Sequence, residues 1–267
     1  MDVVRQLVQQ RPDFFANKPA ADGGAEQIND FIWASPGLSY SYLIKTSAGR
    51  IVINTGMGFE GPVHKRAYDA ILPGPTPYII LTQGHVDHVG GVHLLREPGT
   101  KLIAQSNNAA CQADDARIRN VRSSQSAIWF GAQIEATIKL MRDNPEAMKQ
   151  DAPVPDITFD DHYDIECGGL KLQLLSCPGG ETIDSLAIWL PEHKICFTGN
   201  MFGPLFPHFP NFNTIRGDRY RYFEPYLKTL ARVRALEPEM LITGRYDPIV
   251  GKDLIKACLD RLEAAVS

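Results

Sequence analysis

The sequence has little of what several classes of protein require. Its 27 lysine and arginine residues are outnumbered by 31 aspartates and glutamates, and the formal net charge is -4. This balance supplies no positive field for nucleic acid or an anionic membrane, so we expect neither as a partner. No apolar run approaches the roughly eighteen residues that a membrane-spanning helix needs. Residues 1–11 carry acid and amide side chains where a secretory signal has an apolar stretch, so we expect a cytoplasmic protein.

Cysteine is also scarce and irregularly placed. The five cysteines are odd in number, and no two of them have the C-x-x-C spacing of a zinc ribbon. They therefore predict no disulfide framework, but reduced thiols that are mostly buried. These residues are Cys111, Cys167, Cys177, Cys196 and Cys258.

The sequence does contain enough apolar material for one substantial core. Its 267 residues are 44% hydrophobic, which is sufficient for a large buried interior. No internal repeat, low-complexity tract or linker is visible along the chain. We therefore take residues 1–267 as a single domain.

Short apolar runs and period-two alternation predict strands, and helical spacing predicts helices between and after them. The predicted strands are 40–45, 50–54, 78–82, 101–105, 157–166, 170–176, 185–190, 194–198 and 240–243. The predicted helices are 64–72, 219–236 and 252–265, with a helical insertion at about 107–150. Two β-rich halves, each followed by helices, indicate an α/β (α+β) fold in which two sheets pack together and helices lie outside.

Two histidines and an aspartate follow the apolar run that ends near Thr82. His85, Asp87 and His88 can direct imidazole nitrogens and a carboxylate into one small volume, which suits a borderline-soft divalent metal ion. The glycines at 90–91 allow the chain to turn tightly after the cluster. The alternative is a polar loop with hydrogen-bonded histidines.

The surrounding residues carry a resemblance to a known family. Residues 82–91, Thr-Gln-Gly-His-Val-Asp-His-Val-Gly-Gly, resemble the T-H-x-H-x-D-H-x-G-G signature of the metallo-β-lactamase superfamily. The resemblance implies an αββα sandwich with a site for one or two metal ions. Within that superfamily the alkylsulfatases are most similar. Three segments support this: 178–181 looks like their P-G-T-E, 213–217 followed by Arg221 like their T-L-R-G, and 245–251 like their H-H-W-P-x-W-G.

The departures from that signature concern the ligands. Gln83, Asn200 and Arg245 stand where the resemblance implies a histidine, a second acid and a last histidine, and Asn54 replaces a structural aspartate. Amide oxygens are weak ligands for zinc, and a guanidinium cannot coordinate and repels a metal ion. The expected metal positions are therefore His85, Asp87, His88 and Glu181, with Gln83 and Asn200 as weak additions.

This ligand set predicts one zinc ion or none, rather than two. A single ion is expected at His85 and Glu181 near Gln83, or at His88 and Asp87 near Asn200. Either arrangement leaves a coordination position for water, whose pKa a bound divalent cation lowers towards neutrality. Asp87 is then a ligand or the general base that orients the water.

Further candidates concern the substrate. Arg245 and Arg216 are expected to clamp an anionic group, since guanidinium forks match sulfate, phosphate and carboxylate. The alternative for Arg216 is an ion pair with an aspartate such as Asp218. His208 is expected near the substrate, and an apolar pocket or ordinary core packing explains the aromatic residues Phe206, Phe209 and Trp129.

The remaining histidines are given structural roles. We expect His64, His162 and His193 to be solvated or capping residues, and His93 to be a buried packing residue.

These observations predict a metal-dependent hydrolase. Its expected substrate is a hydrophobic, anionic small molecule with an ester-type bond, such as a sulfate ester. One alternative is a metal-poor binding protein for a small molecule. Another is a lyase or isomerase in which His85, Asp87 and Arg245 perform acid-base chemistry without a metal.

Overall fold

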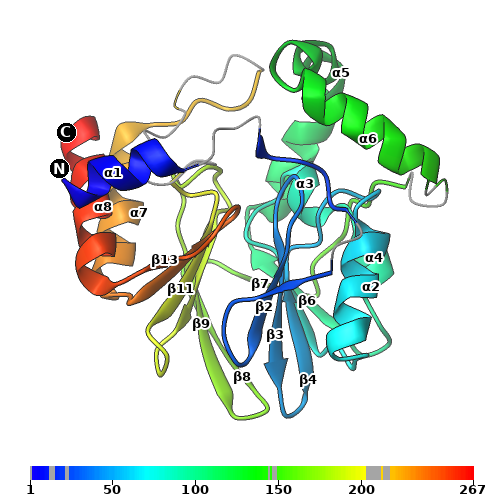
Figure 1. Ribbon diagram of the computed structural model, residues 1–267, viewed down its shortest axis with the longest axis horizontal. Coiled ribbons are helices and arrows are strands. Elements are labelled where there is room, and N and C mark those ends of the chain that lie inside the picture. Colours follow the sequence, from blue (N-terminus) through cyan, green and yellow to red (C-terminus); the bar gives the residue numbers. More distant parts are fainter. Residues whose placement is uncertain are drawn as a thin grey trace.

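Two mixed sheets lie face to face, and helices cover the outer face of each (Figure 1). The computed structural model describes residues 2–11, 16–21, 24–143, 145, 149–202, 212 and 217–267, apart from the side chains of residues 127 and 129. The order of layers is helix, sheet, sheet, helix, as the sequence predicts.

The first sheet contains seven strands in the order β1-β2-β3-β4-β5-β6-β7. Strands β1 to β4 are antiparallel neighbours, and β4 to β7 run parallel. The strands are β1 Glu26–Gln27, β2 Ile32–Ser35, β3 Ser41–Thr46, β4 Gly49–Ile53, β5 Tyr78–Ile80, β6 Lys101–Gln105 and β7 Ile157–Phe159. Parallel neighbours need a crossover, which helix α2 (Gly61–Ile71) provides between β4 and β5.

The second sheet contains six strands in the order β13-β12-β11-β10-β9-β8. All neighbours in it are antiparallel except β11 and β12, which run parallel. The strands are β8 His162–Cys167, β9 Leu170–Ser176, β10 Leu186–Leu190, β11 Ile195–Gly199, β12 Met240–Thr243 and β13 Ile249–Val250. Helix α7 (Phe223–Ala235) provides the crossover between β11 and β12.

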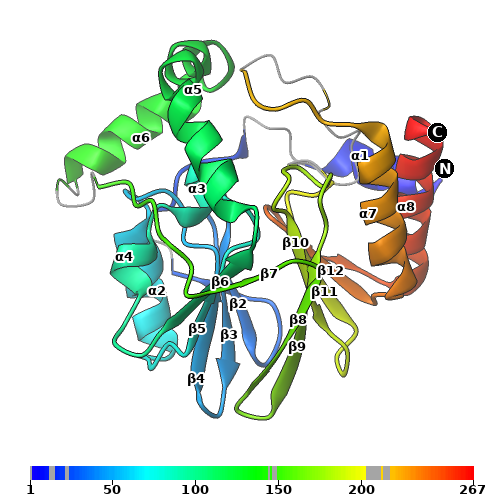
Figure 2. The same cartoon turned by 180° about the vertical axis from the view of Figure 1, so that it is seen from behind.

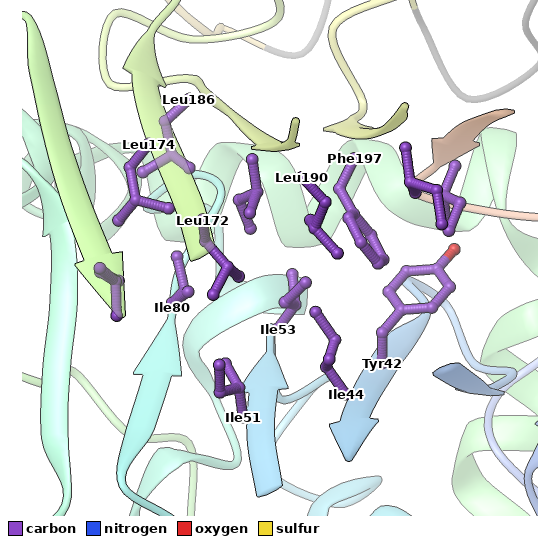
Figure 3. Packing of buried hydrophobic residues seen from close by; sticks show 14 of the residues in the cluster. Tyr42, Ile44, Ile51, Ile53, Ile80, Leu172, Leu174, Leu186, Leu190 and Phe197 are labelled. Carbon is purple, nitrogen blue, oxygen red and sulfur yellow. The ribbon is translucent and has the colours of Figure 1, made fainter. Parts of the chain in front are cut away.

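The main core fills the space between the two sheets. Tyr42 and Ile44 of β3 point into it, whereas Leu43 between them points to the outer face, as period-two alternation requires. Leucines and a phenylalanine of the second sheet meet these residues (Figure 3). Leu172, Leu174, Leu186, Leu190 and Phe197 are 1% exposed or less.

Helices bury the outer faces. The short helices α3 (Val86–Val89) and α4 (Val92–Leu95) follow β5, and α4 contacts α2 beside the first sheet. The helices α1 (Val3–Gln10), α7 and α8 (Lys252–Val266) cover the second sheet (Figure 2). None of the helices in the described ranges has the length and apolarity needed to cross a bilayer.

The predicted helical insertion is confirmed. It contains α5 (Asn108–Trp129) and α6 (Gly131–Asp143), which extend beyond one end of the sandwich, as both views show (Figures 1 and 2). The five cysteines are all buried and free, in agreement with the absence of paired spacing.

Two expectations about elements are wrong, and six elements of the described residues were missed. Residues 157–166 do not form one strand, because β7 pairs with β6 in the first sheet and β8 pairs with β9 in the second. The helix expected from residue 219 begins at Phe223, after Tyr222 in an extended conformation. The elements α1, β1, β2, α3, α4 and β13 were not predicted, since most of them are too short to show a period.

Candidate functional site

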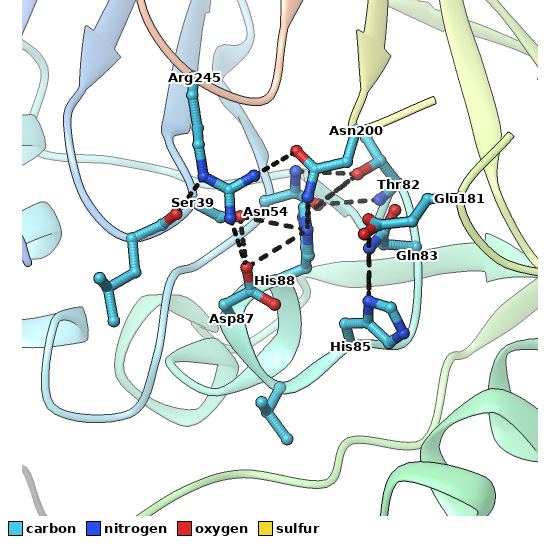
Figure 4. A network of polar contacts seen from close by, with 12 residues as sticks. Ser39, Asn54, Thr82, Gln83, His85, Asp87, His88, Glu181, Asn200 and Arg245 are labelled. Carbon is cyan, nitrogen blue, oxygen red and sulfur yellow. Dashed lines mark hydrogen bonds and ion pairs between the residues drawn. The ribbon is translucent and has the colours of Figure 1, made fainter. Parts of the chain in front are cut away.

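The candidate site lies where chain segments leave the carboxyl ends of four strands. Residues after β4, β5, β11 and β12 meet at one edge of the sandwich, and the link between β9 and β10 joins them (Figure 4). Asn54, after β4, takes a positive φ of 55°. Its Oδ1 accepts from the backbone N–H of Thr82 at 2.9 Å, and its Nδ2 donates to the Thr82 hydroxyl at 2.9 Å. This pair fixes the start of the histidine cluster.

Two glycines allow close approaches at this edge, one between the two sheets and one between the ends of neighbouring strands β11 and β12. A Cβ added to Gly199 would lie 2.8 Å from the Thr82 hydroxyl oxygen. A Cβ added to Gly244 would lie 2.0 Å from Oδ1 of Asn200. Both separations are too short for any side chain, so the position of Asn200 depends on a glycine at residue 244.

The guanidinium of Arg245 lies inside one half of the site. Its Nη1 donates to Oδ1 of Asn200 at 2.8 Å and its Nη2 to Oδ2 of Asp87 at 3.0 Å. Its Nε donates to the backbone carbonyl of Leu38. The Ser39 hydroxyl donates to the same Asp87 oxygen at 2.7 Å. Arg245 is therefore held by three segments, and the residue is only 8% exposed.

His88 is fully buried beside this guanidinium. Its Nε2 lies 3.1 Å from Nδ2 of Asn200, which can only donate, so Nε2 is the accepting nitrogen. Its Nδ1 lies 3.4 Å from the Thr82 hydroxyl. Burial lowers the pKa of His88 despite the charge of Asp87, which agrees with a neutral ring.

Asp87 remains an anion in this environment. Burial acts to raise its pKa, but the neighbouring His88, the positive charge of Arg245 and the Ser39 hydrogen bond hold the pKa well below its usual range. Arg245 keeps its positive charge at every physiological pH, so its interaction with the Asp87 carboxylate does not depend on pH in that range.

This half of the site does not fit a metal ion. Of its four expected positions, Asp87 and Asn200 accept hydrogen bonds from Arg245, and His88 accepts one from the amide of Asn200. The fourth position is Arg245 itself, which has no lone pair to offer.

Gln83 occupies the centre of the other half. Its Nε2 donates to Oε2 of Glu181 at 2.7 Å and lies 2.9 Å from Nδ1 of His85. Arg221 donates to the other oxygen of Glu181 at 3.2 Å. Burial acts to raise the pKa of Glu181, but Arg221, His85 and the Gln83 hydrogen bond lower the pKa to about 2. Glu181 is therefore ionised at neutral pH.

The half of the site around Gln83 fits one cation if the Gln83 side chain rotates. Nδ1 of His85 lies 3.8 Å from Oε2 of Glu181. Two ligands of one zinc ion, each at about 2.1 Å, lie at most about 4.2 Å apart, so this spacing is compatible with a shared ion. The amide nitrogen of Gln83 is not a ligand, so its side chain must turn to present Oε1 instead. With that rotation His85, Glu181 and Gln83 would hold one zinc ion.

A cluster from the insertion supports the other side of His85. His85, Asp115 of α5 and Asp218 have ligand atoms within 4.8 Å of one another. Arg122 forms ion pairs with both aspartates, so its one positive charge already offsets part of their negative charge. Asp115 also accepts from the backbone N–H of Val86 at 3.2 Å, at the start of α3. These contacts are a structural support rather than a second metal site.

The structure brings most of the predicted residues together. The six expected metal positions and Arg245 lie together in two hydrogen-bonded groups, one around Gln83 and one around Arg245 (Figure 4). Arg216, His208, Phe206, Phe209 and the side chain of Trp129 lie outside the described residues. Asp218, the alternative partner of Arg216, forms an ion pair with Arg122 at 3.3 Å.

One histidine was assigned wrongly. His64 is fully buried rather than solvated, and its Nδ1 lies 2.7 Å from the Ser35 hydroxyl. Burial lowers its pKa to about 3. His93 is half-buried and lies 3.8 Å from Asp151, whereas His162 and His193 are exposed as expected.

Five contributors to the site were not selected from the sequence. They are Leu38, Ser39, Glu60, Asp115 and Arg122, and Arg221 was noted only as part of a motif. All of them reach the cluster through tertiary contacts, and no local spacing marks them.

Comparison with known proteins agrees with the sandwich. The sequence profile described as the metallo-beta-lactamase superfamily matches residues 34–245. The linear primary-alkylsulfatase of Pseudomonas sp. (strain ATCC 19151) is 23% identical over 242 residues, which are 84% of this chain and 44% of that protein. The beta-lactamase-like protein 2 homolog of Caenorhabditis elegans is 23% identical over 220 residues, or 79% and 57% of the two chains. This chain thus spans less than two thirds of the length of either relative.

Solved structures show the same fold. The stereoselective inverting sec-alkylsulfatase Pisa1 from Pseudomonas sp. has a TM-score of 0.73 at 18% identity, covering 95% of this chain and 45% of that one. A metallo-beta-lactamase from Pontibacter korlensis has a TM-score of 0.61 at 17% identity, covering 90% and 98%.

Proposed function

Because the chain belongs to the metallo-beta-lactamase superfamily, we propose that it is a hydrolase of an ester-type bond in a small, anionic molecule with a hydrophobic part. The observation that carries this proposal is the group of His85, Gln83 and Glu181 beside Arg221. It combines an imidazole, an ionised carboxylate and a guanidinium, which are the groups that hydrolysis of an anionic ester uses.

The sulfate ester is the finer proposal for the substrate. It is supported by the names of two similar proteins, an alkylsulfatase by sequence and a sec-alkylsulfatase by structure. Arg216, with Arg221 nearby in the sequence, is proposed to bind the anionic group. Phe206, Phe209, Trp129 and His208 remain the proposed contacts of the hydrophobic part, and we place the protein in the cytoplasm.

The chain's own groups have separable roles in this proposal. A zinc ion held by His85 and Glu181 would supply a polarising charge and lower the pKa of a water molecule. Arg221 orients the Glu181 carboxylate through its hydrogen bond to Oε1, which does not depend on the rotation of Gln83. Asp87 accepts from Arg245 and Ser39 through Oδ2, so its other oxygen is proposed as the acceptor of the proton of the attacking water.

A panel of esters with one alkyl chain tests the proposal. The purified protein, with and without added zinc, is assayed on dodecyl sulfate, dodecyl phosphate and an ester of dodecanol with a carboxylic acid. We expect turnover of at least one ester, and loss of about a hundredfold or more in kcat/KM in His85→Ala. The exposed His193→Ala is the matched control and should retain full activity. Absence of turnover throughout the panel, or full activity of His85→Ala, contradicts the proposal.

A second function is favoured by one observation. The amide of Gln83 already satisfies Glu181 and lies against His85, as expected for a site that works without a metal ion. We therefore propose, as the alternative, a small-molecule binding protein or a lyase or isomerase on the same fold. Binding of an alkyl sulfate by calorimetry without any hydrolysis, in the presence of zinc, supports this alternative over the first.

A further inference from the structure

We propose that Arg245 is a resident cation, which takes the place of a metal ion in the half of the site formed by Asp87, His88 and Asn200. The chain therefore binds no divalent cation there, and any bound metal is confined to the half that contains His85 and Glu181. This inference concerns the same site as the proposed function, but it does not depend on which bond is cleaved.

The first argument is that the guanidinium uses the atoms that a metal would need. Nη2 donates to Asp87 and Nη1 to Asn200, at 3.0 and 2.8 Å. Nδ2 of the same Asn200 faces Nε2 of His88 at 3.1 Å. An ion that took Oδ2 of Asp87, Oδ1 of Asn200 and Nε2 of His88 as its ligands would have to break all three hydrogen bonds.

The second argument is charge. Asp87 is mostly buried, and a buried carboxylate needs a compensating cation. Arg245 supplies that charge at every physiological pH, since its guanidinium does not deprotonate in proteins. A divalent cation beside it would experience strong repulsion in an environment of low dielectric constant.

The third argument is that the guanidinium is anchored and cannot easily move aside. Its Nε donates to the Leu38 carbonyl, a third acceptor besides Asp87 and Asn200. The Leu38 backbone N–H donates to Oε1 of Glu60 at 2.8 Å, and Glu60 is fully buried. The same carboxylate oxygen accepts from the N–H of Ala20 at 2.9 Å. Moving Arg245 would therefore remove one of two hydrogen bonds to the Leu38 carbonyl, the other being from Nδ2 of Asn17 at 3.0 Å.

The inference is tested by measuring the zinc content of a variant in which the half with His85 and Glu181 can no longer bind zinc tightly. In His85→Ala the half with Glu181 loses its imidazole, so any tightly held ion must be bound by Asp87, His88 and Asn200. The protein is loaded with zinc, washed by gel filtration and analysed by mass spectrometry of the metal. We expect less than about a tenth of an equivalent of zinc in His85→Ala.

The reciprocal variant restores ligands. In His85→Ala combined with Arg245→His and Asn200→Asp, the cation is removed and two ligands are added. We expect about one equivalent of zinc and a zinc-dependent rise in the melting temperature, because ligand binding stabilises the folded state. The matched control is His85→Ala with Arg245→Lys, which keeps the charge and should bind no more zinc than His85→Ala.

The outcomes are distinct. Half an equivalent or more of zinc in His85→Ala overturns the inference, because an ion would then bind despite Arg245. Failure of the folded triple variant to bind zinc also overturns it, since the arginine would not be what excludes the metal. If the triple variant does not fold, the single variant alone decides. Metal content requires no substrate, so the ester assay and this experiment can fail independently.

Discussion

The buried carboxyl group of Glu60 is expected to make the stability of the folded protein depend on pH. Glu60 precedes α2, is fully buried, and accepts backbone N–H groups from Ala20, Leu38 and Met57 at 2.8 to 2.9 Å. Burial raises its pKa from 4.5 to about 7, because it outweighs the three backbone hydrogen bonds. Through Leu38 the carboxylate also supports the position of Arg245.

The direction of the pH dependence follows from the fact that Glu60 binds its proton more tightly in the folded protein than in the unfolded chain. Between pH 4.5 and about 7, the folded protein keeps a proton on Glu60 that the unfolded chain has lost. The stabilising contribution is thus complete below pH 4.5 and is lost as the pH rises through about 7. A pKa difference of this size corresponds to about 3 kcal/mol in all, of which about 2.5 kcal/mol is lost between about pH 5 and about pH 8.

Urea unfolding of the wild type and of Glu60→Gln at several pH values measures this contribution. Glutamine does not titrate, so subtracting the two free energies of unfolding removes the contributions of His64, His88 and other shared groups. The amide of the variant faces the N–H of Met57 with a second donor, which adds a cost that does not change with pH. We expect the stability of the wild type relative to the variant to fall by about 2.5 kcal/mol from about pH 5 to about pH 8.

The outcome is decided by how the stability difference between wild type and Glu60→Gln changes with pH, and not by the size of that difference at any one pH. A difference that is flat with pH, or that rises, refutes the reasoning, because Glu60 would then not be more basic in the folded protein. The exposed Glu224→Gln is the matched control, since Glu224 has a lowered pKa and titrates only in acid. Its difference from the wild type should not vary above about pH 6.

Three further changes test the packing and the site. Arg50→Met should lower the free energy of unfolding by about 3 kcal/mol, because Arg50 is fully buried and pairs with Asp69 and Glu97; an unchanged urea midpoint would contradict this. Gly244→Ala should destabilise the protein by about 1 to 3 kcal/mol, since the new Cβ displaces the Asn200 amide. An unchanged melting temperature would show that residue 244 and the Asn200 side chain are less closely packed than the structure indicates. Gln83→His should raise the zinc content of the His85 half, and failure to do so would count against this assignment of ligands.

The sequence predicted the sandwich because its strands are apolar enough to show their period. It also predicted that His85, Asp87 and His88 belong to one polar site, because they lie within four positions. It could not show that residues 157–166 divide between two sheets, since hydrophobic alternation does not identify a strand's partner.

The errors at the site have a related cause. His64 appeared solvated because its helical neighbours are polar, yet the Ser35 hydroxyl from β2 provides its partner inside the protein. The sequence indicated that Arg245 and Gln83 are poor ligands. Only the fold shows that Arg245 binds the Asp87 carboxylate and Gln83 binds the Glu181 carboxylate.

The contact of Asp115 with Val86 bears on how this fold can be altered. A carboxylate on α5 accepts the N–H at the start of the short helix that carries Asp87 and His88. The insertion therefore helps to set the direction of the site's own side chains, in addition to extending beyond the sandwich. Exchanging it with the insertion of another protein would change the geometry of the candidate site together with the proposed substrate contacts, so the two cannot be engineered independently.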